Sequence, residues 1–152
     1  MPKSQEDKIE VVCQNRKARH QYHILDTVEA GIVLLGHEVK SVREHHVTLD
    51  ASYATVTEGE VWLVDCNIDA HKFTHHVEHK PKRKRKLLLH KREITKFGEK
   101  AAQQGHTLVP LRMYFKNGRA KVELAVCKGK QEHDKRQAMK EKDAKKEIRR
   151  QQ

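Results

Sequence analysis

The chain has 152 residues, of which 35% are charged and 36% hydrophobic, which suggests one domain with room for a core. Lysine and arginine total 32 against 21 acidic residues, so the formal net charge of +11 favours a polyanionic partner, nucleic acid or an anionic membrane. No apolar run approaches the roughly 20 residues of a membrane-spanning helix. The polar start of the chain has no signal core and neither end carries a lipidation motif, so we expect a cytoplasmic protein.

The first part of the chain predicts mainly β-structure. Residues 9–13 form a short apolar strand pattern, and the charged residues 15–20 fit one helical turn. Residues 22–35 are rich in Ile, Leu and Val, and the glycines in and after them predict bends that let a sheet curl. Residues 38–43 alternate valines with charges, which predicts a strand with one basic, solvent-facing side.

Turn chemistry predicts two β-hairpins farther along. The first spans residues 53–64 around Glu58-Gly59. The second spans residues 111–126 around Asn117-Gly118, and it is the stronger prediction because Asn-Gly supplies the positive φ angles of a type I′ turn.

One helix and a tail complete the pattern. Residues 85–104 carry apolar side chains on one helical face, and Gly105 predicts the end of that helix. From residue 128 the chain is densely charged and too polar to fold alone, although its helix propensity is good. We therefore predict a tail, residues 128–152, that is disordered when free and helical when docked.

These elements predict a mainly β domain over residues 1–127. About six antiparallel strands with bends favour a small closed barrel over a parallel sheet. The nearest common architecture with a nucleic-acid face is the oligonucleotide-binding (OB) barrel, here with flanking helices and the basic C-terminal tail.

Two basic clusters and one acid are candidates for RNA contact. Residues 15–19 and the five successive cations of residues 82–86 would neutralise phosphates, although a solvated loop is the alternative for each. Glu29 is an acid in an apolar strand region. It is either a paired surface carboxylate or an acceptor for a base or a ribose hydroxyl.

Catalytic and metal patterns are weak. His75-His76-Val77-Glu78-His79 contains H-x-x-E-H, a zinc-peptidase pattern on helices, but Pro81 disfavours a helix there and the basic run beyond it would repel a cation. The three cysteines are far apart and offer neither zinc spacing nor a disulfide framework. We expect a non-enzymatic protein with no metal site and no cofactor.

Several blocks of the sequence, in order, resemble the small protein B (SmpB) family of SsrA-binding proteins. The blocks are residues 15–20 with Tyr22, residues 29–31, residues 36–43, residues 50–54, residues 85–93 and residues 128–136. The resemblance implies an OB-type barrel that binds the tRNA-like domain of transfer-messenger RNA, in place of a missing anticodon arm. It also implies entry into the A site of a stalled ribosome, helped indirectly by elongation factor Tu, with the tail folding in the empty mRNA channel beside the decoding centre.

The resemblance also assigns residues to two sets. The RNA-binding set is Asn15, Lys17, Arg19, His20, Glu29, Lys40, Arg43, Lys86 and Leu88. The ribosome-sensing tail set is Gly129, Lys130, His133, Asp134, Lys135 and Arg136. Gln131 departs from the family pattern, because many relatives carry a second lysine there. On charge alone, a general nucleic-acid-packing protein remains the alternative.

Overall fold

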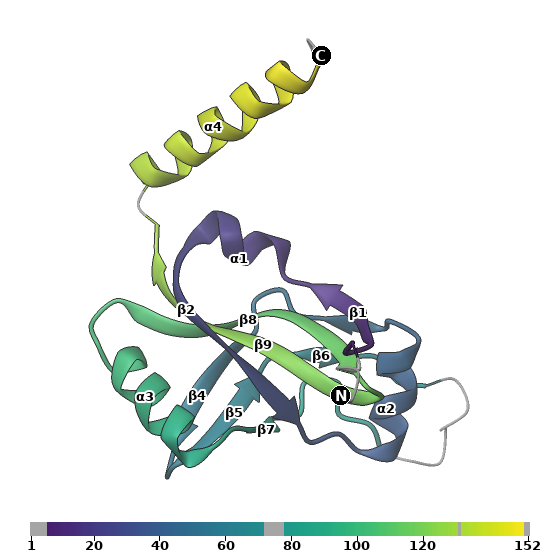
Figure 1. The fold of residues 1–152 in the computed structure, drawn as a ribbon. Helices are drawn as coiled ribbons and strands as arrows, with labels where there is room; N and C mark the ends of the chain where they lie inside the picture. The colour runs from purple at the N-terminus through teal and green to yellow at the C-terminus, as the bar shows by residue number, and fades with distance from the viewer. Residues whose placement is uncertain (1–5, 72–77, 131, 151–152) are drawn as a thin grey trace, which may run out of the picture.

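The computed structural model describes residues 6–71, 78–130 and 132–150, with the side chains of residues 132–134 left out (Figure 1). The elements in chain order are β1 (Ile9–Gln14), α1 (Arg16–Gln21), β2 (Tyr22–Ile32), α2 (Gly36–Arg43), β3 (Val47–Thr48), β4 (Tyr53–Thr57), β5 (Glu60–Val64), β6 (Asn67–Ile68), β7 (Arg85–Leu88), α3 (Lys91–Ala101), β8 (His106–Lys116), β9 (Arg119–Gly129) and α4 (Glu132–Arg150). The protein is mainly β, with helices beside a large antiparallel sheet, as the sequence predicts.

The large sheet has seven strands in the order β1-β8-β4-β5-β7-β2-β9, and β8 also pairs with β9. The pairings therefore run from β8 through β4, β5, β7, β2 and β9 and return to β8. All of them are antiparallel. β8 is shared between two neighbours, because β1 pairs with residues 112–116 and β4 pairs with Leu108. A separate ladder joins the short strands β3 and β6.

The main core lies on the inner face of this sheet. Leu63 from β5, Leu87 from β7, Met113 from β8 and Leu124 from β9 are at most 1% exposed. Burying a side chain of this size stabilises the fold by about 1.5–3 kcal/mol relative to leaving it exposed. Phe97 of α3 joins the same cluster, which fixes that helix against the sheet.

A smaller apolar cluster lies on the outer face of β8 and β9. Ala18 of α1 packs there with Val109 and Leu111 of β8 and with Ala125 and Cys127 of β9. The cluster fixes α1 over one end of the outer face, as Figure 1 shows, and leaves its charged side chains in solvent.

Both predicted hairpins are confirmed. Glu58 and Gly59 have φ angles of 52° and 74° between β4 and β5, and Asn117 and Gly118 have 51° and 80° between β8 and β9. Two successive positive φ angles are the signature of the type I′ turn. The short strand at residues 9–13 and the helical turn at residues 15–20 are also confirmed, as β1 and α1.

The strand predicted over residues 38–43 is wrong, because this segment is helix α2. Glu38, Ser41 and Val42 are its buried residues, the i, i+3, i+4 spacing of one helical face. The valines, three residues apart, also fit that period better than strand alternation. The backbone N–H of Leu35 donates to Glu38 Oε1 at 2.8 Å, which caps the start of the helix.

The helix predicted over residues 85–104 is only partly right. Residues 85–88 form β7, which pairs with β5 and β2, and the helix is Lys91–Ala101. The first part of the segment pairs with two neighbouring strands instead of extending the helix, so tertiary pairing overrides helical periodicity. Gly105 (φ 80°) lies in the turn before β8, beyond the helix end at Ala101.

The C-terminal segment forms helix α4, which projects from the sheet beyond α1 (Figure 1). The last strand runs two residues past Cys127, to Gly129. Whether the tail is disordered when the protein is free stays a prediction. In the described residues, no helix is long and apolar enough to span a membrane.

Candidate RNA-binding surface

Asn15 holds α1 in place. Its Oδ1 accepts a hydrogen bond from the N–H of Ala18 at 3.3 Å, which caps the helix. Its Nδ2 donates to the carbonyls of Pro110 at 3.0 Å and Leu49 at 3.4 Å. The side chain is 6% exposed, and its polar atoms hydrogen-bond within the protein. This member of the RNA-binding set therefore positions the helix whose cations face outward.

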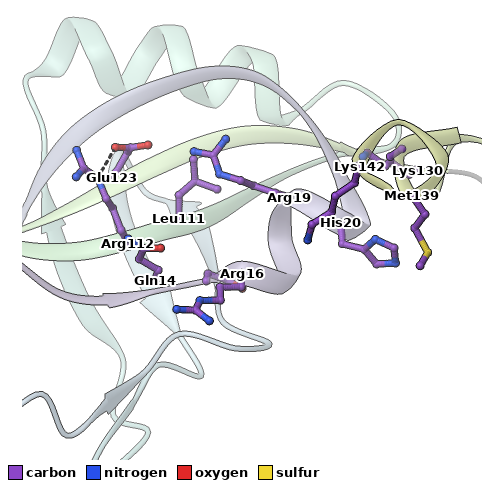
Figure 2. A pocket seen from close by; sticks show the side chains of 12 residues that line it. Gln14, Arg16, Arg19, His20, Leu111, Arg112, Glu123, Lys130, Met139 and Lys142 are labelled. Carbon is purple, nitrogen blue, oxygen red and sulfur yellow. Dashed lines mark hydrogen bonds and ion pairs between the residues drawn. The ribbon is translucent and has the colours of Figure 1, made fainter. Parts of the chain in front are cut away.

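A groove of about 770 Å³ runs between α1, the outer face of β8 and β9, and α4. Figure 2 shows its cations, which are Arg16, Arg19, Arg112, Lys130 and Lys142, together with the imidazole of His20. Glu123 is the acid in its lining, and it accepts a 2.8 Å hydrogen bond from Arg112 Nε. The remaining cations give the groove an excess of positive charge, which suits the phosphates of a nucleic-acid backbone. We call it the cationic groove.

Two cations of this groove lie outside the RNA-binding set expected from the sequence. Arg112 and Lys142 were absent from the expected set, although both line it. Arg112 could have been found, because it is the one cation between apolar residues in the first strand predicted for the Asn117-Gly118 hairpin, and a cation in such a strand is expected to face solvent. Lys142 could not, because only the placement of α4 brings it near α1.

Glu29 lies on β2 within a polar network on the same outer face. The hydroxyl of Tyr114 donates to its carboxylate, and Lys116 Nζ lies 3.5 Å from both carboxylate oxygens. The hydrogen bond from Tyr114 and the charge of Lys116 lower the pKa of Glu29. Burial and the same hydrogen bond raise the pKa of Tyr114. Glu29 is thus ionised and paired, yet its side chain is 37% exposed and can accept a further hydrogen bond.

The run of cations at residues 82–86 is not an open phosphate-binding loop. Arg85 is 0% exposed, and its guanidinium donates to Glu38 Oε2 from Nε at 2.8 Å. Its other donors reach the carbonyls of Cys66, Arg83 and Pro81 at 2.7–3.0 Å. Burial pushes the pKa of Glu38 upward, but hydrogen bonds from Arg83, the Leu35 N–H and Arg85 outweigh it, so this pKa is lowered.

The rest of the run is divided between pairing and solvent. Arg83 lies 2.5 Å from Glu38 Oε1, and Lys86 Nζ lies 2.9 Å from Glu60 Oε1. Lys82 and Lys84 are exposed. The prediction that all five cations would meet phosphate is therefore wrong for Arg85, because its charge is enclosed by the fold.

The other members of the RNA-binding set lie on separate elements. Lys17 is exposed on α1, 4.0 Å from Asp50. Lys40 and Arg43 are exposed on α2, with the Arg43 guanidinium 5.9 Å from the ring centre of Phe115. Leu88 of β7 is 52% exposed and covers Gly31 of β2, where an added Cβ would meet Leu88 Cβ at 3.2 Å.

The tail set begins inside the sheet. Gly129 pairs with Tyr22 as the last residue of β9, and the Lys130 N–H donates to the Gln21 carbonyl at 2.9 Å. Lys135 and Arg136 lie in α4. His133 and Asp134 also lie in α4, and their side chains are outside the described part of the structure. The structure thus joins the start of the tail to α1.

The H-x-x-E-H pattern gains no support from the described residues. His75, His76 and Val77 lie outside them, and His79 Nε2 is 2.7 Å from the Ile68 carbonyl. Among the residues that the structure describes, no group of three or more His, Cys, Asp or Glu could hold a metal ion. Burial raises the pKa of Cys13 and Cys127 to about 11 and that of Cys66 to about 12, so these thiols stay protonated near neutral pH.

Comparisons with protein families, with curated proteins and with solved structures all find the same family of proteins. The family model described as "SmpB protein" matches residues 12–152. The SsrA-binding protein of Sulfurihydrogenibium sp. (strain YO3AOP1) is 55% identical over 138 residues, 91% of each chain. That of Halothermothrix orenii is 51% identical over 145 residues, 95% of this chain and 94% of the relative. A solved chain described as "tmRNA-SmpB: a journey to the center of the bacterial ribosome" matches with a TM-score of 0.68 and 44% identity, covering 84% of this chain and 93% of that one.

Proposed function

Because the chain belongs to the SmpB protein family, we propose that it binds transfer-messenger RNA and acts with it on the ribosome in trans-translation. The observation that carries the proposal is the cationic groove, in which α1, β8 and α4 contribute cations to one continuous surface that a nucleic-acid backbone can contact. The relatives are SsrA-binding proteins, and the similar solved chain is described together with transfer-messenger RNA and the ribosome.

The scaffold is, in this proposal, an OB-type barrel over residues 1–127. The strand pairings that leave β8 through β4 and return to it through β9 support closure. Closure pairs both sides of each of these six strands and leaves β1, which pairs only with β8, as the edge strand. The outer face and the loops of an OB barrel are the surfaces that bind nucleic acid.

The RNA in this proposal is the tRNA-like domain. Arg19 and His20 contact its phosphates in the cationic groove, with Lys17 on the other side of α1 and Lys40 and Arg43 on α2. Glu29 accepts a hydrogen bond from a base or a ribose hydroxyl, which its ionised and partly exposed carboxylate supports. Asn15 acts through the helix that it caps.

The tail carries the second half of the proposal. The RNA complex, brought by elongation factor Tu through the charged RNA, enters the A site of a stalled ribosome. The tail, residues 128–152, then extends from the sheet into the empty mRNA channel with its α4 segment as a helix, and Gly129, Lys130 and residues 133–136 lie nearest the decoding centre. The helical state of α4 supports the channel-bound form. The ten basic against five acidic residues of the whole tail, residues 128–152, favour ribosomal RNA.

A gel-shift titration tests the RNA half. It compares the tRNA-like domain with an elongator tRNA at two salt concentrations, because phosphate attraction falls with salt while base and shape recognition persist. We expect a preference for the tRNA-like domain that survives the higher salt. Equal binding of both RNAs that collapses with salt would instead favour the general nucleic-acid-packing protein.

A further inference from the structure

A second groove, of about 330 Å³, lies on the opposite face of α1. Arg16, Arg19 and His20 line the cationic groove, whereas Lys17, Ala18 and Gln21 line this one. At 100° per residue these two sets point to opposite sides of the helix. We call it the tyrosine groove; its other lining residues are Asn15, Tyr22, Asp50, Ala51, Ser52, Tyr53, Thr107 and Val109.

Two partly exposed aromatic side chains come together in this groove, whereas Trp62 of β5 is also partly exposed but does not line it. In the described part of the chain, Phe97, Tyr114 and Phe115 are 3–8% exposed and belong to the fold. Tyr53 is 39% exposed, and Tyr22 is half-buried. Both line the tyrosine groove, so two of the three tyrosines of the chain meet at one small concave site. Exposed tyrosines beside cations are the surface on which unpaired bases stack.

The walls of the groove are fixed by the fold. Tyr22 ends α1 by donating its N–H to the Ala18 carbonyl, and it packs on the outer apolar cluster. The turn at residues 49–52 is closed by the Ser52 N–H and by the Ser52 hydroxyl, both donating to the Leu49 carbonyl. Asn15 Nδ2 reaches the same carbonyl at 3.4 Å, which ties α1 to this turn. The site is therefore formed before a ligand arrives, which lowers the entropic cost of binding.

The rim offers a cation and an acceptor that are only loosely paired. Lys17 Nζ lies 4.0 Å from Asp50 Oδ2, with the side chains 71% and 46% exposed. An exposed pair of this length contributes little to stability. Lys17 can therefore turn to a phosphate at small cost and leave the Asp50 carboxylate free to accept hydrogen bonds from the edge of a base.

From this arrangement we propose that the tyrosine groove binds one unpaired nucleobase of the RNA, stacked on Tyr53 with its Watson–Crick edge towards Asp50. A carboxylate accepts only, so it selects a base with donors on that edge. Guanine presents two adjacent donors, its imino and amino N–H groups, and is the preferred occupant. The subsite rests on the proposed RNA-binding function and adds a base-reading site across α1 from the phosphate-binding groove.

Fluorescence of 2-aminopurine tests the stacking. Single 2-aminopurine substitutions are placed at each unpaired purine of the tRNA-like domain and titrated with the full chain. We expect the emission at one position to change on binding of wild type and of Tyr53→Phe, which keeps the ring. Tyr53→Ser should abolish that change and weaken binding by roughly 5- to 150-fold, the range for losing one stacked base. Thermal unfolding checks that Tyr53→Ser still folds.

Inosine at the same position tests the edge contact, because it lacks the amino group of guanine. Wild type should bind the inosine RNA more weakly than the guanine RNA, and Asp50→Asn should bind the two equally. If wild type binds the RNA but Tyr53→Ser leaves both affinity and emission unchanged, the subsite is overturned while the proposed function stands. If wild type shows no salt-resistant binding at all, the proposed function falls and the subsite falls with it.

Discussion

Arg85 and Glu38 form an ion pair that solvent does not reach, with Arg85 Nε 2.8 Å from Glu38 Oε2 and the side chains 0% and 1% exposed. The pair joins β7 to α2, two elements 47 residues apart in the chain. Every N–H of the guanidinium has an acceptor in Glu38 or in a backbone carbonyl. A buried charge with complete pairing is tolerated, but its removal leaves the partner charge uncompensated.

We therefore expect Arg85→Met to lower the free energy of unfolding by about 3–5 kcal/mol, the range for breaking a buried ion pair on one side. Urea denaturation measures it. The matched control is Lys84→Met, one residue away but exposed, which should change stability by less than about 0.5 kcal/mol. Similar effects of the two substitutions would show that the Arg85 ion pair does not stabilise the fold.

Tyr114→Phe should raise the pKa of Glu29 towards its usual value, because the hydrogen bond from Tyr114 is the largest cause of its depression. A depressed carboxyl pKa stabilises the fold above the unfolded pKa, about 4.3, and this contribution is lost as pH falls through the folded pKa. Wild type should therefore lose more stability on acidification than Tyr114→Phe.

Carbon-13 NMR titration of the glutamate carboxyls measures that shift. Tyr53→Phe is the control, since it removes a hydroxyl on β4, outside the Glu29 network. An unchanged Glu29 titration in Tyr114→Phe would mean that the charges of Lys116 and Lys121 set the ionisation of this carboxyl.

Arg19→Ala should weaken binding of the tRNA-like domain and reduce the slope of log affinity against log salt by about one, as expected for loss of one phosphate contact. Titrations at several salt concentrations measure the slope. Lys96→Ala is the control, because Lys96 lies on α3 and pairs with Asp26 at 3.6 Å, outside the cationic groove. A slope that changes equally in both variants would place the phosphate contacts elsewhere.

Truncation of the tail should separate RNA binding from peptide tagging, provided that the cut spares the sheet. Gly129 pairs with Tyr22 and Lys130 bonds to Gln21, so the chain should end after Lys130 and not after Cys127. We expect the shortened protein to bind the tRNA-like domain within a few-fold of wild type, since it loses Lys142 from the cationic groove but keeps the α1 cations. It should not support tagging on stalled ribosomes in a reconstituted translation assay. Loss of RNA binding would contradict the two-part arrangement.

The thiols should react slowly in the native state. Cys66 and Cys127 are 0% exposed, and burial raises their pKa to about 12 and about 11. A thiol-specific chromogenic reagent at pH 8 should modify them only after addition of urea, when all three cysteines of the chain react at once. Rapid native reaction of Cys66 would indicate local opening between β5 and β6.

Asn15 and Glu29 show what the sequence predicts about the RNA-binding set and what it leaves open. Asn15 was assigned to the RNA-binding set, and it caps the helix of that set; its 6% exposure shows that it acts through protein contacts in the free state. Glu29 was left open between a paired carboxylate and an RNA acceptor, and the structure finds it paired with Tyr114 and Lys116 while still partly exposed.

The short-range features of the fold follow from the identity of a few residues. Asn117-Gly118 and Gly59 specify hairpin turns because Gly and Asn adopt positive φ at little cost. Asn15 specifies a helix start because its side-chain oxygen accepts from the N–H of Ala18 in the first turn. The charge excess determined the class of partner, and ordered blocks determined the family.

Only the tertiary structure decided where residues 38–43 and 85–88 belong and which cations are available. The four residues 85–88 fit both helix and strand periods, and pairing with β2 and β5 makes them a strand. Residues 38–43 form a helix whose inner face carries Glu38, the partner of Arg85 on β7. Arg85 and Lys84 are neighbours in one basic run, yet one is enclosed beside Glu38 and the other lies in solvent. Burial depends on contacts between residues distant in the chain, so a run of like charges does not reveal which of them can reach a phosphate.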